Sequence, residues 1–145
     1  MSRLVYLVLV SVCVLLSVTI TIAKSKEFRD KMKTAKANCK AAHGVPEDEM
    51  RALRQNGPQS EEGKCFVGCM MQSMGIIDSG GSFDSGKAEE WANKNYPAGD
   101  KREQARTVID TCQQQVTSSE ICETGAELFD CFKKNGFGLF TPGKK

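Results

Sequence analysis

The six cysteines that follow an apolar N-terminal run limit the fold of this chain more than any other feature. The chain has 145 residues and seven cysteines, of which Cys13 lies inside the apolar run. An even number of cysteines in a short secreted chain is typical of a disulfide framework. We therefore expect all six to pair and to hold one small domain together. They are Cys39, Cys65, Cys69, Cys112, Cys122 and Cys131.

The apolar run itself has the pattern of a secretory signal peptide. It follows a single basic residue and extends over residues 4–23, and the small residues Thr21 and Ala23 occupy the -3 and -1 positions of a cleavage site. An uncleaved membrane anchor is the alternative, because about 20 apolar residues can just span a bilayer. The cleavage site favours removal of this run as a signal peptide. We expect a signal peptide over residues 1–23 and one secreted, extracellular domain over residues 24–145, without stable membrane insertion.

The charge balance of the expected mature chain excludes a strongly polyanionic partner. The full chain carries 20 Lys and Arg against 18 Asp and Glu, and removing Arg3 with the signal peptide leaves a net charge near +1. A nucleic-acid binder would carry a clear excess of basic residues. We therefore expect no nucleic-acid partner.

The apolar residues of the mature chain recur at helical spacing. From Phe28 to Ala42 they fall at steps of 4, 3, 4 and 3, which predicts an amphipathic helix over residues 25–42. A glycine-rich loop with apolar residues covers residues 75–86, and an apolar tail without helix signals covers residues 137–145. No alternation predicts a strand, so we expect an all-α fold of about six helices. Further helices are expected from Pro46 to the stop at Asn56-Gly57-Pro58, from about Ser60 to Met74, from Asp84 to about Asn95, from Asp100 to Val116 and from Thr117 to about Asn135.

Three N-terminal caps are expected at these helices. Asp84 is a suitable cap for the helix that contains Trp91. Asp100 with Glu103, and Thr117 with Glu120, each fit the capping-box pattern.

The spacing of the cysteines restricts their pairing without fixing it. Cys65 and Cys69 are four residues apart on one predicted helix, so their side chains point the same way and they are poor partners. Excluding that pair leaves 12 of the 15 ways to pair six cysteines. A structural zinc site would need closer thiolate spacing and further ligands, and the chain has only one histidine, His43. We therefore expect no metal and no other cofactor.

The gaps between successive cysteines are 25, 3, 42, 9 and 8 residues. In these gaps, in residues 74–84 and in the pair Cys131-Phe132, the chain resembles the insect odorant-binding proteins, namely the six-cysteine pheromone-binding and general odorant-binding proteins. The resemblance covers nearly the whole mature chain. It implies six helices around a central apolar cavity that carries odorants or similar lipophiles. It also implies three disulfides: Cys39 to Cys69, Cys65 to Cys122 and Cys112 to Cys131.

Apolar and aromatic side chains are the candidates for the wall of such a cavity. Flexible, polarizable methionines suit a wall that adapts to varied ligands, whereas ordinary core packing is the alternative reading of the same spacing. Trp91 has polar sequence neighbours, although its indole could donate one hydrogen bond, and Tyr96 could orient a ligand oxygen. The apolar tail either docks onto the cavity mouth or is a disordered end. The candidate ligand-binding residues are Phe66, Met70, Met71, Met74, Ile77, Phe83, Trp91, Val108, Phe129, Phe132, Phe137, Leu139 and Phe140.

The function expected from these features is reversible binding of a small hydrophobic ligand by an extracellular carrier. Carriage of non-odorant lipids or hormones, and a helical module that binds a protein partner, are the alternatives. An enzyme is disfavoured, because His43 has no adjacent carboxylate and no Gly-x-Ser-x-Gly motif occurs. A single histidine also lacks the residues expected for a histidine-driven release of ligand in acid. A chemosensory receptor partner and the choice between monomer and homodimer stay open.

Overall fold

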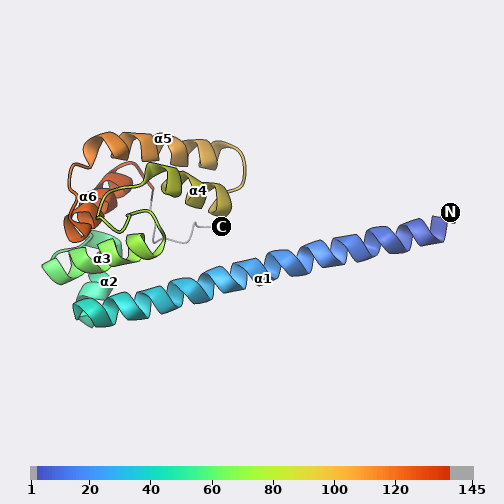
Figure 1. Cartoon of the computed structure of the whole chain (residues 1–145), viewed down its shortest axis with the longest axis horizontal. Helices are drawn as coiled ribbons and strands as arrows, with labels where there is room; N and C mark the ends of the chain where they lie inside the picture. The colour runs from blue at the N-terminus through green and yellow to red at the C-terminus, as the bar shows by residue number, and fades with distance from the viewer. Residues whose placement is uncertain (1–2, 138–145) are drawn as a thin grey trace. The chain divides into compact units, whose positions relative to one another are not determined.

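The structure is a computed structural model that describes residues 3–137. Over these residues the chain forms α-helices and no strand, so the predicted all-α fold is confirmed (Figure 1). The helices are α1 (Arg3–His43), α2 (Glu47–Asn56), α3 (Glu61–Ser73), α4 (Ser85–Asn95), α5 (Asp100–Gln115) and α6 (Ile121–Lys134).

The first helix is longer than the sequence pattern predicted. Residues 3–43 form one continuous helix, because neither glycine nor proline interrupts them. It ends at His43, and Gly44 follows in the left-handed region at φ 62°. The chain divides into two compact units, residues 1–37 and residues 38–145. Among the described residues, no helix combines the length and the apolarity needed to cross a membrane.

The core of the second unit is built on the contact between α3 and α6. The two helices meet at glycines: a Cβ atom added to Gly125 would lie 2.5 Å from the Cα atom of Gly68, and one added to Gly68 would lie 2.2 Å from the carbonyl oxygen of Ile121. The backbones therefore touch with no side chain between them. Met71 of α3 and Leu128 of α6 are completely buried. Around this pair, α5 packs on α6, α4 lies alongside α5 and α2 contacts α3 (Figure 1).

The three disulfides have the pairing that the family resemblance implied. The last turns of α1 are bonded to α3, α3 is bonded to α6, and α5 is bonded to α6. Both α3 and α6 are therefore covalently tied to two other helices. The pairs are Cys39 with Cys69, Cys65 with Cys122, and Cys112 with Cys131, with Cα atoms 5.7, 4.0 and 5.8 Å apart respectively.

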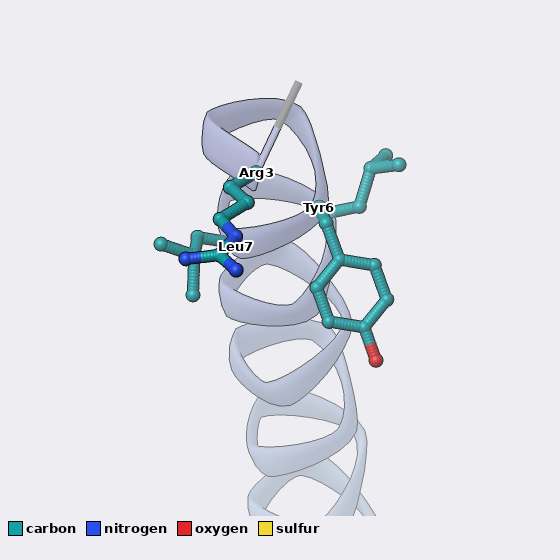
Figure 2. Close-up of a pocket in the computed structure, with 4 residues that line it drawn as sticks. Arg3, Tyr6 and Leu7 are labelled. Carbon is teal, nitrogen blue, oxygen red and sulfur yellow. The ribbon is translucent and has the colours of Figure 1, made fainter. Parts of the chain in front are cut away.

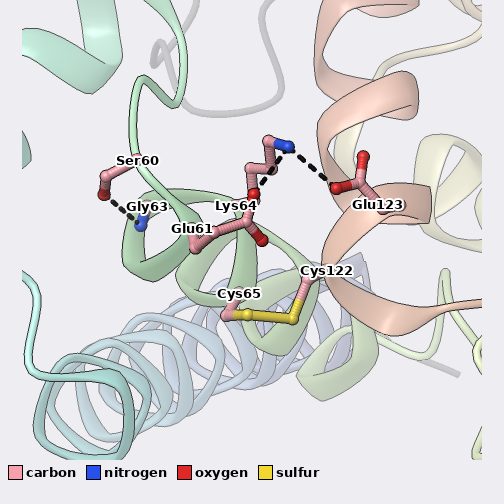
Figure 3. The surroundings of a disulfide bond; sticks show 7 residues. All are labelled: Ser60, Glu61, Gly63, Lys64, Cys65, Cys122 and Glu123. Carbon is pink, nitrogen blue, oxygen red and sulfur yellow. Dashed lines mark hydrogen bonds and ion pairs between the residues drawn. A yellow bond between two sulfur atoms is a disulfide. The ribbon is translucent and has the colours of Figure 1, made fainter.

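A polar contact accompanies the disulfide between α3 and α6 (Figure 3). The ammonium group of Lys64 donates to Glu123 of α6 at 2.8 Å and to Glu61 of its own helix at 2.9 Å. Both hydrogen bonds raise the pKa of Lys64, and the bond to Glu123 has the larger effect. The hydroxyl oxygen of Ser60 accepts the backbone N–H of Gly63 at 3.0 Å and caps the start of α3.

The glycine-rich loop before α4 buries the apolar residues that the sequence placed in it. Ile76 and Ile77 are almost fully buried, and Ile77 forms an isolated antiparallel bridge with Phe83. A carboxylate oxygen of Asp78 accepts the backbone N–H groups of Gly80 and Ser82, at 2.8 and 2.9 Å, and so holds the tip of the loop.

One of the three expected caps is confirmed and two are wrong. The Asp84 carboxylate accepts the backbone N–H of Lys87 at 2.9 Å and caps α4. At α5 the helix begins at Asp100 itself, because Gly99 enters it at φ 122°. Thr117 lies outside α6, and its backbone N–H donates to Glu127 at 2.9 Å. A carboxylate from within α6 thus holds the segment before the helix, and no side chain of the described residues caps the start of α6.

Candidate ligand-binding site

Five aromatic side chains form a continuous row in the second unit. The rings of Phe83 and Phe132 meet edge to face with centroids 6.3 Å apart, and Phe137 lies 6.3 Å from Phe132. Tyr96 lies 5.2 Å from Phe137, and Trp91 lies 6.0 Å from Tyr96. These separations are those of favourable edge-to-face and tilted ring pairs. We call these residues the aromatic row, with Phe83 at one end and Trp91 at the other.

The end of α6 positions two members of the row. Gly136, at φ 72°, donates its N–H to the carbonyl of Lys133 at 3.1 Å, and Phe137 donates to the carbonyl of Phe132 at 2.8 Å. This pair of bonds is a Schellman motif, which places the residue after the glycine against the last helical turn. The ring contact between Phe132 and Phe137 is the apolar contact that usually accompanies it.

Phe83 is held at the other end of the row by the loop before α4. Its bridge to Ile77 fixes one side. The Asp84 backbone N–H donates to the carbonyl of Ile76 at 2.8 Å, while the Asp84 side chain caps α4. The backbone at Phe83 is therefore held by its bridge to Ile77 and by the hydrogen bond from Asp84 to Ile76.

Tyr96 is fixed by a residue that the sequence analysis did not single out. The guanidinium of Arg102 donates to the carbonyl of Tyr96 at 2.7 and 3.2 Å, and to the carbonyl of Asn93 at 3.0 Å. These carbonyls lie at the end of α4, where arginine is a favourable partner. Tyr96 is half-buried, and this burial raises the pKa of its hydroxyl above the usual value.

Trp91 has a donor that no atom of residues 3–137 accepts. Its ring is half-buried against Tyr96. The indole nitrogen Nε1 is buried and has no hydrogen-bond partner among the described residues.

The structure brings four of the predicted ligand-binding residues together in the aromatic row, namely Phe83, Trp91, Phe132 and Phe137. The other candidates lie in α3, α5, α6 and the loop after α3, and burial of this kind fits a core position as well as a cavity wall. Their contact with a ligand stays a prediction. Of these, Phe66, Met70, Met71, Ile77 and Val108 are buried, Met74 and Phe129 are half-buried, and Leu139 and Phe140 lie outside the described residues.

A hollow in the first unit lies on the first turns of α1. It is lined by Arg3, Tyr6, Leu7 and Leu9, and Figure 2 shows Arg3, Tyr6 and Leu7 projecting from a single helix. All four lining residues belong to the expected signal peptide. We take the aromatic row as the candidate ligand-binding site, because it gathers four of the predicted ligand-binding residues.

Comparison with known proteins finds one matching family and relatives that align with most of the chain. The model of the PBP/GOBP family matches residues 22–135. The chain is 26% identical to general odorant-binding protein 28a of Drosophila melanogaster over 130 residues, which cover 88% of this chain and 90% of that protein.

The solved structures that are similar to this chain include two fly proteins. Odorant-binding protein dmelOBP28a from Drosophila melanogaster aligns with a TM-score of 0.64 at 26% identity, over 76% of this chain and 93% of that one. Fatty acid binding protein OBP56a from the oral disk of the blowfly Phormia regina aligns with a TM-score of 0.59 at 23% identity, over 76% and 92% respectively. At that lower identity the second likeness concerns the fold alone.

Proposed function

Because the chain belongs to the PBP/GOBP family, whose members are odorant-binding carrier proteins, we propose that it is an extracellular carrier of small hydrophobic ligands. It binds odorants, pheromones or similar lipophiles reversibly in an internal cavity of the second unit. The observation that carries this proposal is the aromatic row, since it gathers five aromatic rings from α4, α6 and their flanking segments in the interior of the second unit.

The chemistry of the row suits a ligand recognised by shape rather than by charge. Burying about 200 to 300 Å² of apolar ligand surface at about 25 cal/mol per Å² gives roughly 5 to 8 kcal/mol. That range corresponds to dissociation constants of about 200 to 1 μM. A carrier of this kind takes up ligands and also releases them.

The disulfides make an internal cavity tolerable. A hollow core costs stability, because side chains around the cavity lose packing contacts. Three cross-links offset that cost by restricting the unfolded chain. They also suit an oxidising extracellular compartment.

Secretion by way of the apolar N-terminal run is part of the proposal. Cleavage after Ala23 would divide α1 and leave residues 24–43 as the first helix of the mature domain. N-terminal sequencing of the protein exported from an insect expression host is expected to begin at Lys24. An N-terminus at Met1 on the exported protein would contradict this step.

The test of the carrier proposal is binding of an apolar naphthylamine dye to refolded residues 24–145 and its displacement by a ligand panel. The panel contains alcohols, esters, terpenoids and fatty acids, the last because the blowfly protein with this fold is a fatty acid binding protein. We expect saturable dye binding that some panel members reverse. Lack of saturable binding by the folded protein would contradict the carrier proposal and favour a protein partner.

A variant in the aromatic row tests whether the dye binds there. Phe83→Ala removes a half-buried ring at the end of the row and is expected to weaken dye binding by about tenfold, the effect of losing roughly 1 to 2 kcal/mol of buried apolar contact. Ser79→Ala, at an exposed position of the same loop, is the matched control and is expected to bind like wild type. Equal dye affinity of the two variants would place the ligand elsewhere.

A further inference from the structure

The indole N–H of Trp91 is the feature of the proposed site that the carrier function does not yet explain. Its nitrogen is buried, and no atom of the described residues accepts a hydrogen bond from it. Proteins pair nearly all their buried donors, since an unpaired donor forfeits the bonds it would make to water. The backbone carbonyl of Trp91 is already satisfied by the side chain of Asn95, at 2.7 Å. Asn95 therefore satisfies an acceptor of Trp91, and the indole N–H stays without a partner among the described residues.

The other unpaired buried nitrogen among the described residues is of a different kind. Nε of Arg106 belongs to a guanidinium whose two remaining nitrogens contact Glu103 at 3.3 Å and Asn93 at 3.4 Å. The positive charge of Arg106 is therefore paired with the carboxylate of Glu103. The indole of Trp91 has a single donor and no second group to satisfy it.

Trp91 lies at one end of the aromatic row, and this position determines which part of a ligand would meet its indole N–H. Trp91 is the terminal member, in contact with Tyr96, and the phenylalanine rings continue the row away from it. A ligand whose hydrocarbon part follows the phenylalanines would bring one end of its chain to the indole. The indole nitrogen itself is buried, so water competes weakly for this donor.

We propose that the indole N–H of Trp91 selects, among hydrophobic ligands, elongated molecules that carry an uncharged oxygen acceptor at one end, such as aldehydes, ketones, esters and alcohols. This inference rests on the proposed carrier function and specifies the ligand class of the same site. A carboxylate is a poorer match, because one neutral donor does not compensate for the desolvation of a buried charge. Hydrocarbons without oxygen leave the donor unpaired.

The test compares ligands that differ only in the acceptor. Refolded residues 24–145 are titrated with nonane and with 2-nonanone in competition with the apolar naphthylamine dye, and affinities are corrected for the water solubility of each ligand. One neutral hydrogen bond to a buried donor is expected to favour the ketone by about 3- to 10-fold. Nonanoate at pH 8 is expected to bind more weakly than the ketone.

Trp91→Phe keeps an aromatic ring and removes the donor. It is expected to bring the ratio of ketone to alkane affinity close to 1, whatever loss the smaller ring causes for both ligands alike. Lys94→Ala, at an exposed position of the same helix, is the control and is expected to keep the wild-type ratio. An unchanged ratio in Trp91→Phe, or an equal loss for both ligands, would overturn the inference.

A spectroscopic measurement on the unsubstituted protein gives an independent test. Trp91 is the only tryptophan of the chain, so its indole N–H gives one proton resonance. We expect 2-nonanone to move this resonance downfield and nonane to leave it nearly in place. Equal shifts with both ligands would overturn the inference, whereas failure of the dye to bind wild type would instead overturn the carrier proposal.

Discussion

Several charged side chains fix the connections between helices by bonding to backbone groups. Arg102 holds the carbonyl of Tyr96 at the end of α4, and Glu127 accepts the backbone N–H groups of Thr117 and Ser118 before α6. Glu49 of α2 accepts those of Gln59 and Ser60, at 3.3 and 3.0 Å. Each bond joins residues 6 to 11 positions apart. Local sequence patterns do not identify such partners, because the intervening turn decides whether they meet.

Glu49 is expected to make stability sensitive to acid. The hydroxyl of Ser60 donates to its carboxylate at 2.6 Å, and with the two backbone N–H groups it lowers the pKa of Glu49 below the ordinary value of 4.5. The unfolded chain then binds more protons, so this stabilisation is complete above pH 4.5 and is lost as the pH falls through the folded-state pKa.

The corresponding variant is Glu49→Gln. Urea denaturation at pH 7 is expected to show a loss of about 0.5 to 1 kcal/mol, a value reduced because the carboxylate is partly exposed. The difference from wild type should shrink at pH 3. Glu62→Gln, at an exposed position of α3, is the control. A difference that is the same at both pH values would rule out the carboxylate as its source.

Tyr96 is expected to titrate above its ordinary pKa of 10.0, because burial disfavours the phenolate. It is the only tyrosine of residues 24–145, so absorbance near 295 nm reports on it alone. Since the folded state retains the proton longer, the stabilisation is present below pH 10.0 and is lost as the pH rises through the folded-state pKa. In denaturant the midpoint should return to about 10. A native midpoint at or below the denatured one would contradict the burial of this ring.

At the scale of secondary structure, the close contact between α3 and α6 sets the geometry of the second unit. Gly68 and Gly125 leave no room for a Cβ atom, and this contact accompanies the disulfide between Cys65 and Cys122. The helical pattern predicted both helices. It did not predict that two glycines inside them meet, since a small residue gains this role only from the helix opposite.

Gly125→Ala is expected to destabilise the protein by about 1 to 3 kcal/mol, because the added methyl group would overlap the backbone of α3. Thermal unfolding followed by circular dichroism measures the loss. Gly86→Ala in α4 is the matched control: the nearest atom to its added Cβ is 3.4 Å away, so it should be neutral or stabilise by up to about 1 kcal/mol. Equal melting temperatures of the two variants would mean that the helices do not touch at Gly125.

The ends of the helices were predicted better than their beginnings. Gly44, Gly57 and Gly136 lie where the sequence placed helix ends, because a left-handed residue there is tolerated best by glycine. The expected capping boxes at α5 and α6 do not form. A Ser, Thr or Asp followed by Glu matches many positions, and the entry angle of the chain decides which residue becomes the cap.

On the scale of the whole molecule, the cysteine spacing predicted the family and, through it, all three disulfides. The aromatic row was predicted only in part. Four of its members were candidates for the cavity wall, but their order depends on the Schellman motif at Gly136 and on the turn held by Arg102. Tyr96 was only weakly indicated, because a tyrosine beside proline is often a turn residue.

The disulfides should differ in the stability they confer. In the chain-entropy view, the stabilisation rises with the sequence separation of the two cysteines, which is 57 for Cys65–Cys122 and 19 for Cys112–Cys131. Replacing the first pair by alanines should cost about 4 kcal/mol and replacing the second about 3 kcal/mol. Guanidinium denaturation of the two variants measures the order. A larger loss for the shorter loop would show that packing around α5, rather than chain restriction, dominates.

The central claim is that a hydrophobic ligand lies against the aromatic row inside the second unit. Its most direct test is an NMR measurement of nuclear Overhauser effects between unlabelled 2-nonanone and isotope-labelled residues 24–145. We predict effects from the ligand chain to the rings of Phe83 and Phe132, and from the end that bears the oxygen to the ring of Trp91. Saturable binding with effects only to exposed side chains outside the row would contradict the account.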